Sequence, residues 1–429
     1  MWIFLLFIKI KFGIIYGNYW GEKMKELEEK YIELILKKCL NFDDSKSLMI
    51  NCDFKEHIPF TLKVKEKANE MGIFDVCINV NDLDEIHDYL KNTSVEDIKL
   101  NPLIDRTNWN TYALKGGSLL FLTSTVPGLM NDIGEDKIAK WVSERGKTTP
   151  YYRKNVSKYT FPWTIAALPN ERWAKTVFKD DDEAYQKLFY MIMKMCMVDR
   201  DDPIAAWDEY IETNNKYKEK LNNLNIRKMH YTNSLGTDLY IELPDKNIWM
   251  NLDKQNDLGR SLIVNMPSYE IFTSPDYRKT NGIVYASKPL YYNDVCINDF
   301  YIEFKDGKAV SCYAKEGQKT LERIITSEEQ AAYLGEVALV SYASPISNTG
   351  LVFNKTLFDE NASCHLALGR GFVKSIYNSK NLSEEELIAK GLNICATHVD
   401  FMIGTSDLQI EAETNQGKKL IFKKGNFNL

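Results

Sequence analysis

The sequence contains few cysteines, and they are widely spaced. Eight cysteines are spread singly over 429 residues, and no Cys-x-x-Cys pair occurs. A disulfide-rich scaffold needs a higher cysteine density than this, and thiolate metal sites usually have closely spaced cysteine pairs. The cysteines therefore indicate reduced thiols, and we expect a cytoplasmic protein.

A basic stripe is also missing. The chain has 54 Lys and Arg against 60 Asp and Glu, which gives a formal net charge of −6. Proteins that bind nucleic acids carry a concentrated positive charge that attracts phosphate groups. We therefore expect no nucleic-acid partner, and small molecules or peptides fit this composition better as substrates.

No apolar run is long enough to cross a bilayer. The N-terminus has two apolar stretches, residues 2–8 and 12–16, but lysines separate them and no small-residue cleavage site follows. We expect no stable membrane association. Three interpretations of residues 1–23 stay open: a translated upstream extension, a weak membrane or signal element, and an added strand. The first is favoured, because Met24 opens an amphipathic helix.

The rest of the composition is that of a soluble globular protein with a large core. Hydrophobic residues make up 44% of the chain and charged residues 27%. A chain of this length exceeds one ordinary hydrophobic core, so we expect two domains. Near residues 212–222 the sequence pattern changes from alternating helical and strand-like segments to mainly short strand-like segments. We therefore predict an N-terminal domain over residues 24–215 and a C-terminal domain over residues 216–429.

Helical and strand-like patterns alternate in the first half. We predict helices at residues 24–39, 57–71, 132–145 and 181–197, and strands at 47–52, 74–80 and 118–123. This alternation favours an α/β domain with a mostly parallel sheet.

Short strand-like segments dominate the second half, after a charged helix at residues 207–222. They fall at residues 238–243, 261–264, 282–287, 300–304 and 308–312. The pair Asp306 and Gly307 between the last two predicts a tight hairpin turn. The C-terminal domain is therefore expected to be a mixed α+β, strand-rich domain.

Histidine is scarce, and one histidine stands next to a carboxylate in a predicted strand. Only five histidines occur in the chain. Because side chains alternate along a strand, His398 and Asp400 should lie on one face, with Val399 on the other. Such a pair can bind one metal ion, although a hydrogen-bonded structural pair has the same pattern.

Two glutamates stand in unusual surroundings. Glu336 is the single carboxylate of the apolar segment at residues 334–340. A buried unpaired charge is costly, so Glu336 needs a cation, which a Lys, an Arg or a metal could supply. Glu270 lies between Pro267 and Pro275, which favours a stiff loop or an edge strand. A salt bridge is the alternative interpretation of Glu270.

His365 follows a polar turn that contains Asp359, Glu360 and Asn361. The turn leads into an apolar segment. One interpretation is a metal site that uses Glu360 and His365. The other is helix capping by Asp359 or Asn361, with His365 as a hydrogen-bonded core residue.

These observations together yield four carboxylates and two imidazoles: Glu270, Glu336, Glu360, His365, His398 and Asp400. This set suits two adjacent divalent ions of the zinc, cobalt or manganese type. Two such ions can polarise a scissile carbonyl, lower the pKa of a bridging water, and leave a carboxylate free to carry the proton.

Eight motifs occur in one order along the chain: FPWT at 161–164, WAK at 173–175, DPIAAW at 202–207, GTDL at 236–239, NMP at 265–267, LGEVALV at 334–340, TLFDEN at 356–361 and HVDFMIG at 398–404. With these motifs the sequence resembles the aminopeptidase T and aminopeptidase S family, the thermophilic metallopeptidases, over nearly its whole length from Met24. Matched by motif, the metal ligands of that family fall on the same six residues.

The resemblance implies a metal-dependent aminopeptidase that removes N-terminal residues from peptide substrates. It also implies a homodimer that uses two divalent metal ions (Zn, Co, Mn or Mg). Residues 216–429 would then form the metal-binding catalytic domain. Glu336 or a neighbouring carboxylate would bridge the metals or act as the general base.

The sequence departs from the family at two positions. Tyr269 stands where the family usually has an acidic residue, which predicts a change in recognition of the substrate amine. Phe372 stands where the family commonly has a tyrosine. If that phenol stabilises the tetrahedral intermediate, its loss costs on the order of a hundredfold in rate.

Two other functions stay open. One is a metal-stabilised protein of the same family that binds peptides or supports assembly but has lost turnover. Metal content without hydrolysis would indicate this alternative. The other is a different two-metal hydrolase such as a phosphoesterase, which is disfavoured because Arg370 is the main basic residue near the ligands.

Overall fold

The computed structural model describes residues 21–42, 47–255, 259, 261–292 and 295–429. Most of the proposed extension at residues 1–23 thus lies outside the described residues. The predicted first helix is confirmed: residues 21–33 are α-helical and continue into η1 (Leu34–Cys39). No helix in the described part of the chain is both long enough and apolar enough to cross a membrane.

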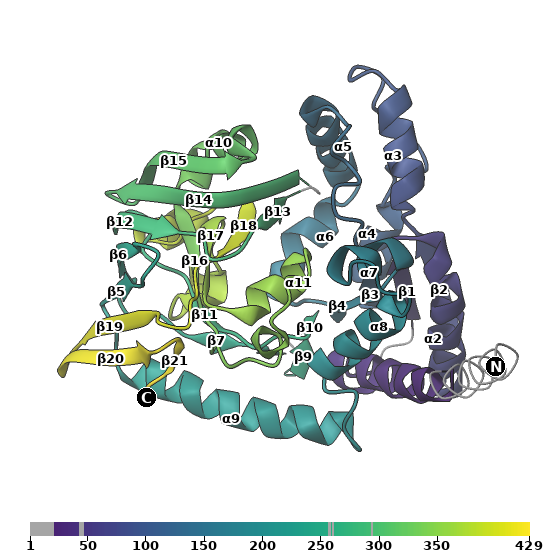
Figure 1. Ribbon diagram of the computed structural model, residues 1–429, viewed down its shortest axis with the longest axis horizontal. Helices are drawn as coiled ribbons and strands as arrows, with labels where there is room; N and C mark the ends of the chain where they lie inside the picture. The colour runs from purple at the N-terminus through teal and green to yellow at the C-terminus, as the bar shows by residue number, and fades with distance from the viewer. Residues whose placement is uncertain (1–20, 43–46, 256–258, 260, 293–294) are drawn as a thin grey trace, which may run out of the picture.

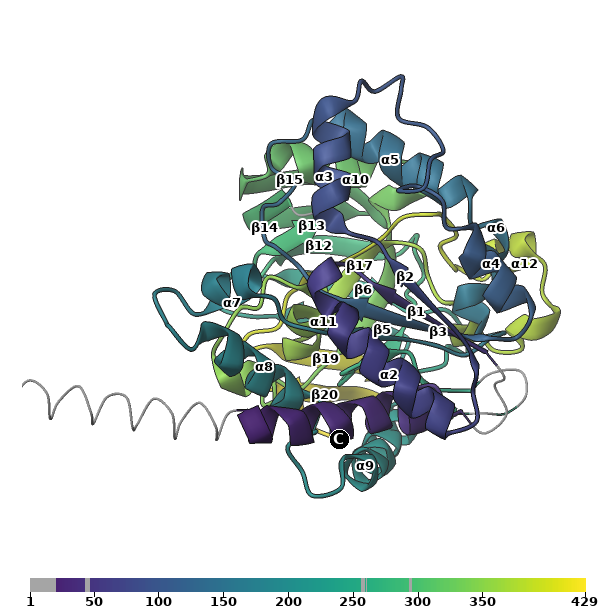
Figure 2. The ribbon, with the colours of Figure 1, turned by 90° about the vertical axis from the view of Figure 1, so that its right-hand side faces the viewer.

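The first half forms a parallel sheet with helices on both faces (Figures 1 and 2). Its strand order is β10-β4-β3-β1-β2. The strands are β1 (Ser47–Cys52), β2 (Asp75–Val80), β3 (Ser118–Thr123), β4 (Trp163–Ala167) and β10 (Asn265–Met266). This confirms the predicted α/β region with a mostly parallel sheet.

The alternation of side chains in β1 explains the two helical layers. Leu48 and Ile50 pack in the core that contains α2 (Ile58–Glu70) and α8 (Ala184–Met195). Met49 points to the opposite face, where it packs with residues of α4 (Thr107–Leu114) and α6 (Pro150–Asn155). Both faces of the sheet are covered, as parallel sheets require. Further helices of this half are α3 (Leu83–Asn92), α5 (Glu135–Lys147) and α7 (Glu171–Val177).

A long helix, α9 (Pro203–Asn223), runs beneath both halves of the molecule (Figure 1). It starts with proline in the first turn, and the Asp202 side chain accepts hydrogen bonds from the backbone N–H groups of Ile204 and Ala205. It packs against η1 from the first half and β7 (Met250–Asn251) from the second. The helix therefore ties the two halves together.

The second half consists mainly of antiparallel strands, which confirms the predicted strand-rich region. One sheet has the order β18-β17-β16-β11-β7. Its strands are β11 (Ile271–Thr273), β16 (Leu334–Leu339), β17 (His365–Gly369) and β18 (His398–Met402), together with β7. This sheet carries most of the predicted metal ligands.

A nine-stranded sheet lies beside it, with the order β13-β14-β12-β6-β5-β19-β20-β21 and β15 paired with β14. The strands are β5 (Lys228–Thr232), β6 (Asp238–Glu242), β12 (Thr280–Tyr285), β13 (Leu290–Tyr292), β14 (Val295–Lys305), β15 (Lys308–Glu316), β19 (Gln409–Thr414), β20 (Gly417–Lys423) and β21 (Asn426–Phe427). Asp306 and Gly307 both have positive φ, 49° and 84°, in the β14–β15 hairpin, as that turn requires. Smaller elements are β8 (Asp253–Gln255), β9 (Ser261–Ile263), α10 (Gln318–Thr326), α11 (Thr356–Asp359) and α12 (Glu384–Ala389).

Residues on either side of the expected boundary at 215/216 share one sheet and one core. Strand β10 pairs in parallel with β4 of the first half. Phe353 and Phe358 lie in the same buried cluster as Trp173 and Trp207. The boundary itself stays a prediction.

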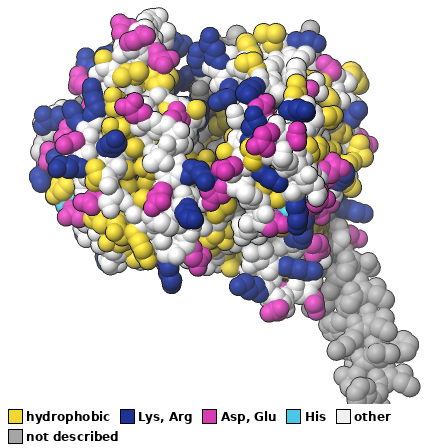
Figure 3. All heavy atoms as spheres, turned by 90° about the horizontal axis from the view of Figure 1, so that it is seen from above, with side chains coloured by type: hydrophobic (Ala, Val, Ile, Leu, Met, Phe, Trp, Pro, Cys, Tyr) yellow, Lys and Arg dark blue, Asp and Glu magenta, His cyan; other side chains and the backbone are white. Residues whose placement is uncertain are grey.

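Acidic and basic side chains are interspersed over the face seen in Figure 3. No large area of one sign stands out on that face, in keeping with the nearly balanced charges of the sequence.

Candidate metal centre

All six predicted ligands line one cavity of about 480 Å³. The antiparallel sheet supplies most of them: Glu336 lies on β16, His365 begins β17, and His398 and Asp400 lie on β18. Glu270 directly precedes β11, and Glu360 begins the short helix η6 (Glu360–Ala362). The cavity therefore brings together residues from five separate segments.

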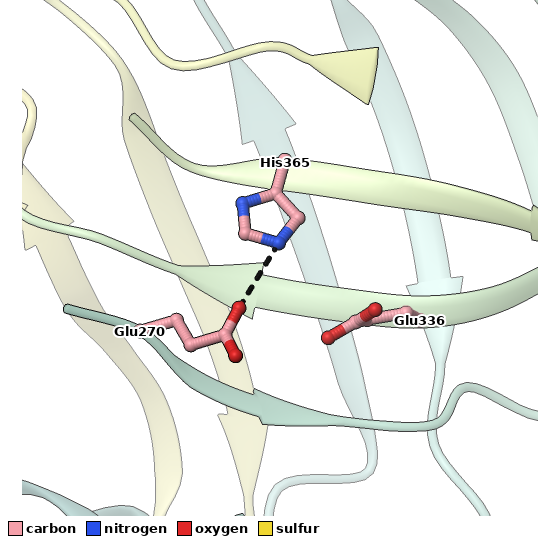
Figure 4. A group of neighbouring side chains, drawn as sticks. All are labelled: Glu270, Glu336 and His365. Atoms are coloured by element: carbon pink, nitrogen blue, oxygen red, sulfur yellow. Dashed lines mark ion pairs between the residues drawn. The ribbon is translucent and has the colours of Figure 1, made fainter. Parts of the chain in front are cut away.

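Glu270, Glu336 and His365 form a first group that could hold a metal ion (Figure 4). One ligand atom of each lies within 4.8 Å of the others. Nε2 of His365 is 3.2 Å from Oε2 of Glu270. The three side chains come from different strands or strand ends and point toward a common space.

Glu336, His398 and Asp400 form a second group of the same kind. Nε2 of His398 lies 3.2 Å from Oε2 of Glu336 and 3.4 Å from Oδ1 of Asp400. As predicted from strand alternation, His398 and Asp400 face the same side of β18. Glu336 belongs to both groups, so its carboxylate lies between them.

A β-bulge at Gly335 explains why Glu336 faces the cavity. The register of β16 with β17 shifts between Leu334 and Glu336, so Gly335 is an extra residue in β16. Without a shift, Leu334 and Glu336 would point to the same face. Instead Leu334 and Val337 pack in the hydrophobic core, while Glu336 lines the cavity.

Backbone carbonyl groups fix both imidazole rings. Nδ1 of His365 lies 2.9 Å from the carbonyl oxygen of Glu360, and Nδ1 of His398 lies 2.8 Å from that of Arg370. When each Nδ1 donates a hydrogen bond to its carbonyl, Nε2 carries the free lone pair. This is the usual arrangement of histidines that bind metal ions.

The crowded carboxylates shift one another's pKa. Burial raises the pKa of Glu336 above its ordinary value, and the charges of Asp400 and Glu270 raise it further, although a hydrogen bond from His398 opposes them. Burial and the charge of Asp400 also raise the pKa of Glu360 well above its ordinary value. Bringing these acids together is therefore costly unless a cation compensates their charge.

The neighbouring groups His365 and Asp400 shift toward their charged forms. Burial lowers the pKa of His365, but the hydrogen bond and charge of Glu270 outweigh it and raise that pKa to about 10. Burial raises the pKa of Asp400, but the charge of His398 outweighs it and brings that pKa below its ordinary value. Positive charge is thus favoured in this cavity.

The residues fit divalent metal ions. Oδ1 of Asp400 is buried and receives no hydrogen bond from the described residues. Carboxylate oxygens and imidazole nitrogens are the donors that zinc, cobalt and manganese accept. A buried carboxylate oxygen without a hydrogen bond, beside the imidazole of His398, is expected where a cation binds.

Glu360 lies outside both groups, although it lines the same cavity. The turn that carries it is held by its neighbours. Asp359 accepts hydrogen bonds from the backbone N–H groups of Phe353 and Lys355, which precede it, and makes no side-chain capping bond to η6. Asn361 is fully buried and accepts a hydrogen bond of 2.6 Å from the backbone N–H of Tyr269. Asn361 thus connects the turn of Glu360 to the segment of Glu270.

The two departures from the family pattern lie in different places. The ring of Phe372 lines the cavity, 5.4 Å from the imidazole of His398. Tyr269 instead points into the core, where its hydroxyl donates to the carbonyl of Met195 and its ring contacts that of Trp207. The Tyr269 side chain is not among the residues that line the cavity. The expected change in recognition of the substrate amine stays a prediction.

Sequence reasoning missed the wall that closes the cavity. Tyr159 and Trp163 from the first half line it, and their rings stack with centroids 6.4 Å apart. Trp163 lies in one of the recognised motifs, which is a signal that could have identified it. Lys254 also lines the cavity, but nothing in the local sequence distinguishes it from other lysines.

Known proteins match this chain over nearly its whole length. Residues 24–427 match the family described as thermophilic metalloprotease (M29). The chain is 35% identical to "Aminopeptidase 2" of Geobacillus stearothermophilus over 408 residues, covering 94% of this chain and 98% of that protein. It is 33% identical to "Aminopeptidase AmpS" of Bacillus subtilis, covering 92% of this chain and 97% of that protein.

A solved structure shows the same fold. "Wild-type AmpT from Thermus thermophilus" superposes with a TM-score of 0.86 and 25% identity, covering 94% of this chain and 99% of that chain. These matches confirm the predicted family and the predicted class of enzyme, a metal-dependent hydrolase that acts on peptides. The chain belongs to the thermophilic metalloprotease (M29) family.

Proposed function

We propose that this protein is an aminopeptidase with a two-metal site that hydrolyses the N-terminal peptide bond of peptides. The observation that carries the proposal is the overlap of two three-residue ligand groups at Glu336 within one cavity. The relatives named above are called aminopeptidases, which favours removal of N-terminal residues.

The six residues divide into roles by their positions. Glu270 and His365 would hold one ion, His398 and Asp400 the other, and Glu336 would bind both. Glu360 would supply the sixth ligand from the same cavity. When bound, two divalent ions polarise the scissile carbonyl and lower the pKa of a water molecule toward neutrality. Cobalt, zinc, manganese and magnesium are the candidate metals.

The walls of the cavity suit a short stretch of peptide. A volume of about 480 Å³ is typical of small-ligand sites rather than of a groove for a folded protein. Tyr159, Trp163 and Phe372 supply flat apolar surfaces that orient a substrate and limit access of water.

We also propose that the protein is a cytoplasmic homodimer. The eight free cysteines favour the cytoplasm, and the family resemblance favours the dimer.

The test is metal-dependent release of amino acids. The full chain is treated with chelator and assayed on a panel of dipeptides with and without added cobalt or zinc, beside a His398→Ala variant. Release that depends on metal and is absent in His398→Ala supports the proposal. Release that is independent of metal would overturn it.

A second candidate function rests on Phe372. This residue faces the cavity without a hydroxyl group, so a peptide-binding protein with little or no turnover is the alternative. Stoichiometric metal binding without release of amino acids from any peptide would favour it.

A further inference from the structure

A second cavity of about 470 Å³ adjoins the metal-ligand cavity. The two cavities share two lining residues, Tyr159 and Lys254. Lys254 lies on the short strand β8, and Tyr159 follows η3 (Val156–Lys158). A substrate that extends beyond the metal ligands past these two side chains would enter the second cavity.

Lys254 is the unusual residue at this junction. Its side chain is 7% exposed, and its ammonium nitrogen has no hydrogen-bond partner among the described residues. Nζ instead lies 3.7 Å from the centroid of the Phe272 ring. A buried ammonium group has three donors to satisfy, and one aromatic face does not satisfy them. Among the described residues, these donors are therefore left for an anionic or strongly polar group.

The second cavity is strongly basic. Besides Lys254, it is lined by Lys218, Lys374 and Lys380. Asp253 is the one acidic residue among its described lining residues, and the Ser261 hydroxyl already donates a hydrogen bond to it. Burial lowers the pKa of Lys254 to about 8, although the charges of Glu270 and Glu336 oppose the shift, and this lysine remains mostly charged near neutral pH. Four cations around one small cavity favour an anion.

A short series of rings connects Lys254 to the metal ligands. The Phe272 ring, which Lys254 contacts, lies 4.7 Å from the Phe372 ring, and the Phe372 ring lies 5.4 Å from the imidazole of His398. An extended peptide advances about 3.5 Å per residue. A carboxylate at Lys254 would therefore belong to a residue only a few positions beyond the scissile bond.

We propose that the basic cavity binds the C-terminal carboxylate of a short peptide whose N-terminal residue lies at the metal ligands. This inference rests on the proposed aminopeptidase function and adds the substrate class, which is peptides of two to a few residues with a free C-terminus. Lys254 is the central contact, because it faces both cavities.

The test compares matched peptides that differ only at the C-terminus, Leu-Gly-Gly and its C-terminal amide. In the unaltered protein, the free acid should have a kcat/KM higher by about tenfold or more, since a charge-assisted hydrogen bond is lost in the amide.

In Lys254→Met, which keeps an apolar side chain of similar length, the ratio of kcat/KM for the acid to that for the amide should fall toward one. Lys390→Met, on an exposed lysine away from both cavities, should keep the ratio of the unaltered protein. Equal values for acid and amide in the unaltered protein, or a ratio that persists in Lys254→Met, would overturn the proposal.

Three further measurements keep the outcomes distinct. If no peptide is hydrolysed, the proposed function fails, and calorimetric binding of the same acid and amide still tests the subsite. If Lys254→Met unfolds, the exposed Lys380→Gln replaces it and should lower the ratio in part.

Leu-Asp-amide and Leu-Asn-amide test whether a side-chain carboxylate can take the place of the C-terminal one. A preference for Leu-Asp-amide without a preference for the free C-terminus would overturn the assignment to the terminal carboxylate.

Discussion

Phe372 is the position at which one added hydroxyl group is expected to change the rate of the reaction. Its ring lies between Phe272 and His398 and lines the cavity, but it carries no hydrogen-bond donor. We predict that Phe372→Tyr raises kcat, by up to about a hundredfold, because a phenol there can donate to the developing oxyanion. The measurement is kcat for a dipeptide under saturating metal. The same substitution at the exposed Phe74 is the control. An unchanged kcat with full metal content would show that a missing phenol does not limit turnover.

Glu336 should be the most sensitive metal ligand, because it belongs to both groups. We predict that Glu336→Gln lowers metal content at both positions, whereas Asp400→Asn lowers it at one, since removing a ligand typically weakens binding at the ions it contacts. Metal per chain is measured by elemental analysis after dialysis against a fixed zinc concentration. Glu336→Gln that retains as much metal as Asp400→Asn would contradict a shared ligand.

Single residues could be predicted from sequence where their chemistry conflicts with their surroundings. Glu336 was recognisable because a lone carboxylate in an apolar strand needs a cation. His398 and Asp400 were recognisable because a strand places alternate residues on one face. Lys254 was not, since its burial depends on segments distant in sequence. The direction of the Tyr269 side chain, which turns toward Met195, was not recognisable either, since the local sequence contains no sign of it.

At the scale of elements, the β-bulge in β16 directs the side chain of Glu336 into the cavity. A side chain at Gly335 would place its first carbon 2.2 Å from the carbonyl oxygen of Gly369 and 2.4 Å from the backbone of Arg370. Arg370 is also the residue whose carbonyl orients His398. The strands must separate to make room for any side chain at this position.

We therefore predict that Gly335→Ala destabilises the protein by about 1 to 3 kcal/mol, as overpacking does, and weakens metal binding as well. Thermal unfolding with and without zinc measures both effects. Gly134→Ala is the control, because nothing lies within 4 Å of the added carbon there. If Gly335→Ala unfolds at the same temperature and binds zinc equally well, the bulge does not position Glu336.

Whole elements followed from the sequence when their patterns were long and regular. The strands predicted at residues 47–52 and 118–123 have those bounds as β1 and β3, because each contains a short apolar run, residues 48–50 and 119–122, that is largely buried on both faces. Strand β10 was not predicted, since two residues contain no periodicity and only its pairing with β4 defines it. The bulge at Gly335 also escaped prediction, because register depends on the partner strand.

At the scale of the whole molecule, the two halves build one site. The ligands come from residues 270–400, but Tyr159, Trp163 and Ile165 from the first half line the same cavity. Trp173 donates a hydrogen bond of 2.6 Å to the carbonyl of Phe353, and its ring stacks on that of Phe358. The second half thus depends on the first for both its cavity wall and part of its core.

We predict that a fragment containing residues 216–429 does not fold independently. Separation would expose Phe353 and Phe358, two fully buried side chains, to water. Each costs roughly 1.5 to 3 kcal/mol in lost burial, which is a large share of the stability of an ordinary domain. Binding of a dye specific for exposed apolar surface should be strong for the fragment and weak for the full chain, and the fragment should release no amino acid with zinc present. The opposite result is a fragment that unfolds cooperatively and holds as much zinc as the full chain. It would show that residues 216–429 are an independent domain, as the change of sequence pattern near residues 212–222 predicts.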